Sequence, residues 1–486
     1  MSKSLRDKTI GGFLWTGIGT LGNGVVSFLV TMFLARLLTP YDFAVIELLI
    51  VFIAVANTFV DSGFSQAIIR DDNPSNIDLS SVFYFNIILS LIIYIVLFFI
   101  APFIAEYFNT PELTVLSRVV FLAIIFNSFT IIQNATLSRS LNFELISKAS
   151  VAGVFFAGLI AVIMAFTGFG VWAIVANMVL MPLFRSGFLW FLSKWTPIFR
   201  FSPLSIKRYF SFGIFLMLQG LLDTIVTNLT SLFIGKVYTK NDLGYYSQGG
   251  KFNGYIVTPL AAIVSKVTYP ILASIKNESS RLKDGYTRII GLVIYITLPI
   301  SLFIFFTAEN IIVLFFGNKW QPAGIYLQLF SIFGFFYLIQ HVCINIVLVK
   351  GKTKTMLFYA ILKQAMRLIA ILVTFRISVL ALAYANIFSS VVASFLYIGL
   401  GMYYIKYSMR EFFQDNYQTI IIATISILLV LFTGDILKNY SANLALFLQC
   451  VLMFVTYFVS SKFIQNQYLM ELLSLVAPLK KKILKK

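Results

Sequence analysis

Two basic side chains stand in the middle of one apolar run. Lys363 and Arg367 lie four residues apart in the run 355–375, so a helix would present both on one face. Charges at that depth in a membrane are costly unless they face a bundle interior or water. Arg offers a forked set of donors suited to phosphate, and Lys offers a mobile point charge. We therefore predict that this pair contacts a phosphate or an acidic sugar, with an internal ion pair to Asp223 as the alternative.

Asp223 is the acid at greatest depth. It lies near the middle of the run 209–234, and Gln219 stands one turn before it on the same helical face. Asn23 occupies the position that corresponds to Gln219 in the repeat described below, so polar groups recur at equal depth. We predict that Asn23, Gln219 and Asp223 line a cavity. The alternative is a buried set of hydrogen bonds that holds helices together.

Four further charges stand in a matched pair of runs. Glu47 and Asp61 lie toward opposite ends of the run 43–64, and Lys251 and Lys266 toward opposite ends of the run 245–272. Because the two runs are repeat counterparts of opposite charge, pairing that breaks and re-forms between the two halves of the chain is one hypothesis. The alternative for the lysines is that each extends its ammonium group to the lipid head groups.

Other kinds of site have no support in the sequence. The single histidine, His341, excludes a metal site built from a histidine cluster, and beside Gln340 it is more typical of a packed polar residue than of a proton carrier. No Gly-rich phosphate loop follows a strand, and no loop is large enough for a soluble domain. We therefore predict no catalytic residue, no metal and no cofactor, and a protein that is not an enzyme.

The composition indicates an all-α integral membrane protein. Of the 486 residues, 59% are hydrophobic and 12% are charged, which no soluble domain of this size could cover with polar surface. The apolar runs are about 20 residues long, the length at which a helix crosses the hydrocarbon layer. They number about 14, from 10–34 to 443–463, and they lack the short alternation of a membrane barrel.

An internal repeat organises these runs. Residues 33–44 read FLARLLTPYDFA and residues 233–244 read FIGKVYTKNDLG, each with a cation and a Thr-x-x-Asp turn between two apolar runs. Duplicated bundles are common in transporters and place the substrate site between the halves. We predict two pseudo-symmetric six-helix lobes plus two C-terminal helices. The predicted parts are an N-lobe over 1–191 (spans 1–6), a cytoplasmic linker over 192–208, a C-lobe over 209–404 (spans 7–12), extra spans over 417–463, and a basic cytoplasmic tail over 464–486.

The distribution of Lys and Arg predicts the orientation. The segments on the side of the N-terminus hold 25 of them, and the opposite loops hold only Arg36, Lys236, Lys240, Lys319, Arg376 and Lys438. Positively charged loops stay in the cytoplasm, so both termini are predicted to be cytoplasmic. The net charge of +18 then reflects topology and contact with anionic lipids. Nucleic-acid binding is not indicated, because no soluble domain surrounds a basic stretch.

Five short motifs follow one another along the chain. They are LSRSLNF at 137–143, GFGVWAIV at 168–175, IGKVYTKNDLGYYSQG at 234–249, FFGNKWQPAG at 315–324 and KGKTK at 350–354. Together they resemble the motifs of Wzx-type polysaccharide or O-antigen flippases, in the lipopolysaccharide or colanic-acid exporter branch of the superfamily that also holds multidrug exporters and lipid II flippases. The resemblance spans about residues 1 to 410. It implies two six-helix lobes, alternating access, a cationic central cavity, and export of undecaprenyl-diphosphate-linked oligosaccharide across the bacterial inner membrane, alongside polymerases that assemble the glycan.

Two other functions remain as alternatives. A MATE-like antiporter for small molecules would share the architecture, but the midplane Lys363 and Arg367 argue against a cationic cargo. A multispan polysaccharide polymerase or glycosyltransferase would need a sizeable outer loop with carboxylates, which this sequence lacks. Proton or sodium coupling is the open part of the transport hypothesis, and Asp223 is the acid we predict to take the proton.

Overall fold

The structure is a computed structural model of the chain. It describes residues 3–71, 73–437 and 441–474, without the side chains of residues 3–14, Lys266, Val267, Thr353 and Asp435. All regular elements in these ranges are helical, and fourteen stretches are long and apolar enough to cross a membrane. The predicted all-α membrane class and its 14 spans are therefore confirmed.

The chain forms two compact units. Unit 1 comprises residues 1–247 with 375–379, and unit 2 comprises residues 248–374 with 380–486. The predicted linker 192–208 includes the non-helical residues 193–202, yet unit 1 continues beyond it. The division into lobes at 192–208 stays a prediction.

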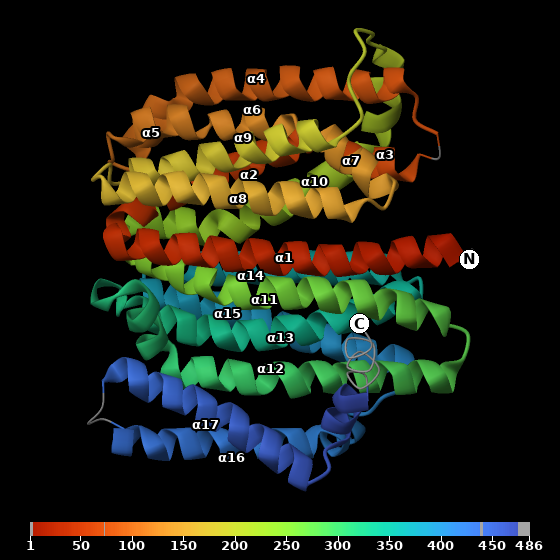
Figure 1. Cartoon of the computed structure of the whole chain (residues 1–486), viewed down its shortest axis with the longest axis vertical. Coiled ribbons are helices and arrows are strands. Elements are labelled where there is room, and N and C mark those ends of the chain that lie inside the picture. Colours follow the sequence, from red (N-terminus) through yellow and green to blue (C-terminus); the bar gives the residue numbers. More distant parts are fainter. Residues whose placement is uncertain (1–2, 72, 438–440, 475–486) are drawn as a thin grey trace, which may run out of the picture. The chain divides into compact units, whose positions relative to one another are not determined.

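Figure 1 labels the helices of both units. Unit 1 contains α1 (Lys3–Leu37), α2 (Pro40–Asp61), α3 (Phe64–Arg70), α4 (Asn76–Tyr107), α5 (Leu113–Val120), α6 (Leu122–Ser128), α7 (Ile131–Arg139), α8 (Phe143–Phe166), α9 (Trp172–Leu192), α10 (Pro203–Val237) and the start of α11 (Lys240–Ser274). Unit 2 contains the rest of α11, α12 (Ser279–Phe316), the short η1 (Asn318–Trp320), α13 (Ala323–Val349), α14 (Thr353–Thr374), α15 (Val379–Ile405), α16 (Met409–Leu437) and α17 (Ala442–Phe463).

The sequence repeat corresponds to two helix starts with the same bonds. At α2, the Thr39 amide donates to Asp42 Oδ2 at 2.8 Å, and the Asp42 amide donates to Thr39 Oγ1 at 3.3 Å. Thr239 and Asp242 exchange the same two bonds at the start of α11, both at 3.2 Å. This reciprocal arrangement satisfies the first amides of a helix, which have no partner within it. The Thr-x-x-Asp turn therefore recurs because each copy starts a helix.

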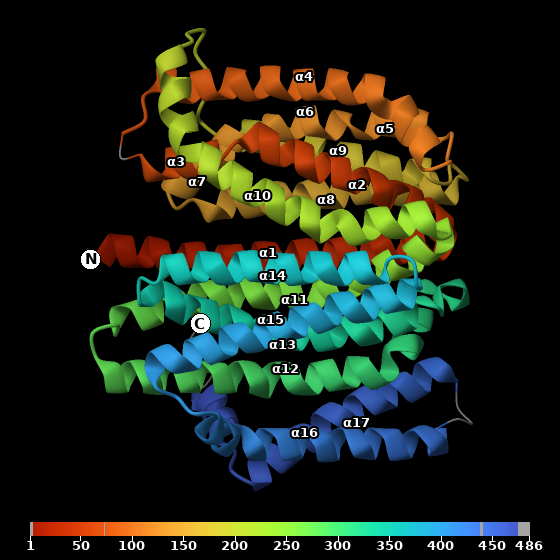
Figure 2. The ribbon, with the colours of Figure 1, turned by 180° about the vertical axis from the view of Figure 1, so that it is seen from behind.

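Small residues let α1 and α8 run side by side in unit 1, as both views show (Figures 1 and 2). Gly19 faces Ser147, Gly22 faces Val151, and Gly158 faces Val30. The residue numbers of these contacting pairs increase together along α1 and α8, so the two helices are parallel. Because lipid tails are as apolar as the helices, close packing rather than hydrophobic burial stabilises such a seam.

A break separates α2 from α3, and the backbone of α10 closes on it. Ser62 and Gly63 both adopt positive φ, at 45° and 72°. A Cβ atom added to Gly213 of α10 would clash with the Ser62 carbonyl oxygen, and one added to Gly63 would lie 2.7 Å from Gly213 Cα. Non-helical backbone at membrane depth is tolerated where protein covers it. The break is therefore a packed feature of unit 1.

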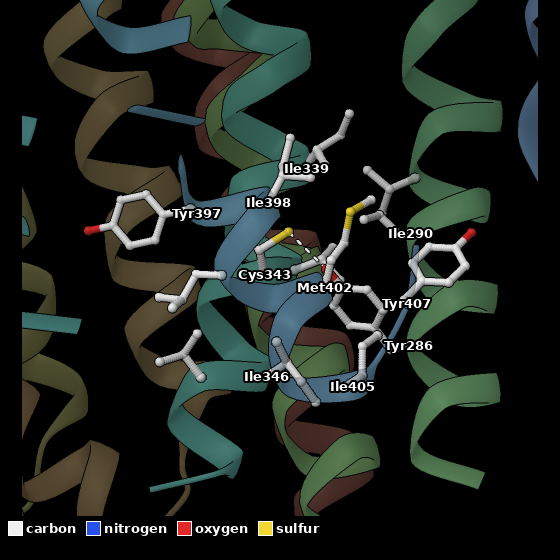
Figure 3. Packing of buried hydrophobic residues seen from close by; sticks show 14 of the residues in the cluster. Tyr286, Ile290, Ile339, Cys343, Ile346, Tyr397, Ile398, Met402, Ile405 and Tyr407 are labelled. Carbon is white, nitrogen blue, oxygen red and sulfur yellow. Dashed lines mark hydrogen bonds between the residues drawn. The ribbon is translucent and has the colours of Figure 1, made fainter. Parts of the chain in front are cut away.

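Large side chains form the core of unit 2 (Figure 3). Tyr286 of α12 is fully buried, and its hydroxyl lies 3.1 Å from the Cys343 Sγ of α13. Ile290, Ile346 and Met402 surround this contact. The core thus joins α12, α13 and α15 around one buried polar pair.

The two C-terminal spans pack on the same unit. α16 and α17 contact each other and α12. A helical segment over 467–474 follows, and a Cβ atom added to Gly291 of α12 would clash with the ring of its Tyr468. Lys283 of α12 donates to Glu411 Oε1 of α16 at 2.8 Å. The predicted extra spans are therefore built into unit 2.

Candidate substrate-binding site

The two predicted cations lie on α14. Lys363 and Arg367 are separated by one helical turn, and both side chains are half-buried. Little of α14 is covered by the described residues, in contrast to α13 beside it. Half-burial gives each charge a partly low-dielectric surrounding, in which an anion is held more strongly than in bulk water. The arrangement suits a phosphate, with a forked donor one turn from a point charge.

His341 of α13 joins this group. Its Nδ1 lies 3.0 Å from Ser265 Oγ of α11, and the Tyr337 ring meets the imidazole edge-on at 4.6 Å. Lys363 is close enough to act on His341 electrostatically. His341 of α13 and Lys363 of α14 thus influence each other electrostatically, which the sequence alone did not indicate.

A second polar contact lies beside His341. Gln340 is buried, and its Oε1 accepts a hydrogen bond from Ser394 Oγ of α15 at 3.1 Å. Sequence analysis missed Ser265, Tyr337 and Ser394 as partners of this region. The spacing of Tyr337 and His341 by four residues was the available signal for that pair. Nothing in the sequence indicated the two serines, because they come from other helices.

The other predicted lysines lie on α11. Lys251 is half-buried. The side chain of Lys266 lies outside the described residues. The proposed exchange of partners between these lysines and the acids of α2 stays a prediction.

Glu47 connects α2 to α10 within unit 1. The side chain is 9% exposed, and its Oε1 accepts a hydrogen bond from Ser231 Oγ at 3.4 Å. Three turns further along α2, Thr58 Oγ1 lies 3.4 Å from Thr224 Oγ1 of the same partner helix. These contacts resemble the polar bonds that hold membrane helices together. A structural role accounts for this contact of Glu47.

Asp61 has a local partner at the helix break. Its Oδ1 accepts bonds from the Ser65 amide at 3.3 Å and from Ser65 Oγ at 2.5 Å. Ser65 lies in the first turn of α3, so the carboxylate satisfies an amide that the helix itself leaves without a partner. Asp61 thereby stabilises the start of α3.

The deep polar residues of unit 1 differ in burial. Asn23 of α1 is half-buried, and its Oδ1 has no hydrogen-bond partner among the described residues. Gln219 and Asp223 of α10 are exposed on the surface of the chain. An exposed acid on a membrane helix needs water or a partner outside the hydrocarbon. This exposure is compatible with the predicted cavity-lining role, which stays a prediction.

Arg185 of α9 is a half-buried cation that the site prediction left out. Its Nη2 donates to Asn134 Oδ1 of α7 at 3.3 Å, and its Cβ lies against Gly153 of α8. The guanidinium thus joins α9 to α7 within unit 1. No group of three or more His, Cys, Asp or Glu that could hold a metal occurs in the part of the chain that the structure describes.

Solved transporters share this fold. The lipid II flippase MurJ in an inward closed conformation aligns with a TM-score of 0.76, covering 93% of this chain and 99% of that one at 14% identity. A multidrug resistance MATE family transporter in an inward-facing conformation aligns with a TM-score of 0.64, covering 80% and 94% at 18% identity.

Curated relatives come from glycan biosynthesis. The teichuronic acid biosynthesis protein TuaB of Bacillus subtilis (strain 168) is 26% identical over 420 residues, which are 85% of this chain and 86% of the relative. The lipopolysaccharide biosynthesis protein WzxC of Escherichia coli (strain K12) is 27% identical over 338 residues, 68% of each chain. The profile of the polysaccharide biosynthesis protein family matches residues 33–325. The resemblance drawn from the five motifs is thus confirmed, and the chain belongs to the polysaccharide biosynthesis protein family.

Proposed function

We propose that this protein translocates undecaprenyl-diphosphate-linked oligosaccharide repeat units from the cytoplasmic to the outer leaflet of the bacterial inner membrane by alternating access. It acts as a transporter and not as an enzyme. Family membership and the fold shared with a lipid II flippase support a lipid-linked glycan as cargo. The observation that carries the proposal is the pair of half-buried cations, Lys363 and Arg367, on one face of α14.

The cargo and the cations have matching chemistry. A diphosphate linker carries negative charge and oxygen acceptors, and Arg and Lys at partial burial supply charge-assisted donors. His341 lies within the electrostatic reach of Lys363 and adds a donor or acceptor to the same group. A cationic drug would be repelled by these residues, so the observed charges favour the glycan carrier over the multidrug antiporter. Membrane lipids and glycan-assembly polymerases complete the proposed set of partners.

Removing both charges tests the proposal. Lys363→Gln combined with Arg367→Gln should lower export of the glycan about tenfold or more, because charge-assisted bonds are worth roughly 1.5–3 kcal/mol each. The measurement is surface glycan in cells that carry only the variant, together with lipid-linked repeat units that accumulate inside. Lys194→Gln with Arg200→Gln, two exposed cations outside α14, is the matched control and should export normally. Normal export by the α14 variant at normal protein level would refute the proposed site.

The proposed orientation has its own test. With cytoplasmic termini, a cysteine at the exposed Asn318 lies outside the cell and one at the exposed Lys352 lies inside. An impermeant maleimide should label the first in whole cells and the second only after lysis. The reverse pattern would overturn the orientation. Variants in which Cys343 and Cys450 are replaced by Ala give the background.

A further inference from the structure

A groove on unit 1 lies outside the site described above. It has a volume of about 420 Å³ and lies between α1 and α8. Its lining is Trp15, Ile18, Gly19, Ser147, Lys148, Val151, Ala152, Phe155 and Phe156. Gly19 packs against Ser147, and the small side chain of Ala152 lies beside the two phenylalanines that border the groove. This volume falls within the roughly 300–1,000 Å³ of ordinary ligand pockets.

Charged and aromatic groups mark one end of the groove. Lys148 Nζ lies 2.5 Å from Glu144 Oε1, one turn earlier on α8, and 5.3 Å from the centre of the Trp15 ring. Both charged side chains remain exposed, at 50% for Lys148 and 41% for Glu144. Tryptophan is enriched at the depth of the lipid head groups. The groove therefore has apolar walls and a polar mouth, which match the acyl chain and the polar head group of a lipid.

The charges at the mouth select among lipids. Lipid tails find apolar neighbours anywhere in the bilayer, so the apolar walls alone give little preference. Glu144 already balances the charge of Lys148, so a head group with net negative charge gains little. A head group that carries a phosphate and a primary ammonium matches the two charged side chains. Its phosphate contacts Lys148, and its ammonium contacts Glu144. A quaternary ammonium has no N–H to donate, and the face of Trp15 is already covered by Lys148.

From this geometry we infer that the groove binds a zwitterionic membrane phospholipid of the phosphatidylethanolamine type, with one acyl chain between α1 and α8 and its head group across Glu144 and Lys148. This site is distinct from the cations of α14 and holds a resident lipid and not the transported cargo. The bound lipid fills the groove that these side chains border.

Quenching of Trp15 fluorescence reads this site directly. The full chain is placed in nanodiscs of one background lipid, and phosphatidylethanolamine, phosphatidylglycerol or phosphatidylcholine with brominated acyl chains is added. The difference between wild type and Trp15→Phe isolates the signal of Trp15. Phosphatidylethanolamine should quench at roughly threefold to tenfold lower concentration than the other two, the range expected for exposed ion pairs that act together.

Variants separate the head-group contacts from the apolar walls. Lys148→Gln should remove the preference among head groups, and Glu144→Gln should shift it toward phosphatidylglycerol. Ala152→Leu should weaken quenching by all three, because the larger side chain occupies the groove. Lys207→Gln, an exposed lysine at the start of α10, is the control and should behave as wild type.

Three results would overturn the inference. They are equal quenching by the three lipids, a preference unchanged in Glu144→Gln, and displacement of the brominated phosphatidylethanolamine by added undecaprenyl diphosphate, which would identify the groove as a cargo site. Each variant must first elute as a monodisperse protein at the wild-type volume. Export assays then separate this inference from the proposed function, because loss of the lipid preference with normal export leaves the transporter proposal intact.

Discussion

The two units differ in the sign and the surroundings of their intramembrane charges. In unit 1 the acids Glu47 and Asp61 accept bonds from Ser231 and Ser65 of the same unit. In unit 2 the predicted site residues are cations along α14 with His341 nearby. The comparison teaches that intramembrane charge alone does not identify a site. A carboxylate with local hydroxyl and amide donors is accounted for by packing, whereas the two cations one turn apart on α14 remain the predicted contact for an anionic cargo.

The helices of this protein meet in two ways. Unit 1 relies on close backbone approach, as at Gly213 against Ser62 and at Gly19 against Ser147. The core of unit 2 around Tyr286 and Cys343 is built from bulky side chains, although Gly249 and Gly324 of the same unit also lie against backbone atoms. Glycine contacts lose their geometry when one methyl group is added, whereas a side-chain core can adjust its rotamers. The close glycine contacts and the side-chain core should therefore respond differently to small substitutions.

The largest effect is expected at the closest backbone contact. Gly213→Ala should destabilise the protein by about 2–4 kcal/mol, because its Cβ would clash with the Ser62 carbonyl oxygen and the backbone must shift. Gly17→Ala, where an added Cβ meets nothing within 4 Å, is the matched control and should be neutral or slightly stabilising. Thermal unfolding in detergent measures both. Equal melting temperatures for the two variants would show that the close backbone contact of Gly213 does not make the protein sensitive to an added methyl group.

A second prediction asks whether the acids of unit 1 do more than pack. Asp223 is exposed, unlike Glu47, and is the proposed proton carrier. Asp223→Asn should retain cargo binding but lose a pH-gradient stimulation of transport in proteoliposomes, about tenfold or 1.4 kcal/mol if coupling is tight. Glu47→Gln keeps an acceptor for Ser231 and should retain the stimulation. An unchanged gradient dependence in the Asp223 variant would make Glu47 or Asp61 the next acid to test.

The third prediction concerns the core of unit 2. Tyr286→Phe removes the hydroxyl that lies 3.1 Å from Cys343 Sγ and should cost about 1 kcal/mol of stability, the usual net value of one buried hydrogen bond. Cys343→Ala in the Tyr286→Phe background should then cost less than Cys343→Ala alone. Unfolding in detergent gives all three values. Strict additivity would show that the two groups do not interact.

The smallest effect is a dependence on pH at the edge of unit 1. The Tyr209 hydroxyl donates to Asp71 Oδ2 at 2.6 Å and, with Arg208, holds the pKa of Asp71 below its usual value. The carboxylate therefore contributes stability above its unfolded pKa of about 3.9, and this contribution is lost as the pH falls through the lower folded pKa. Asp71→Asn should lower the melting temperature at neutral pH and converge with wild type in acid. A constant gap across that range would exclude the linkage.

Much of the fold could be predicted from the sequence, because membrane helices are encoded by long local runs. The 14 spans and the two Thr-x-x-Asp helix starts are examples. Partners across helices could not be predicted. Ser265 gave no signal that it would meet His341, and Gly213 gave none that it would face Ser62. Such contacts depend on the angle at which two helices cross, which no spacing within one helix specifies.

The two matching helix starts have a consequence for synthesis in the membrane. Each depends on bonds between residues three apart, so each pair of spans around it is able to turn back as a hairpin as soon as it leaves the ribosome. The second copy then meets the first, because Gly244 packs directly on the Pro40 carbonyl and leaves no room for a side chain. The two turns thus form independently of each other at insertion and later pack against each other. This contact is a late step in the assembly of unit 1.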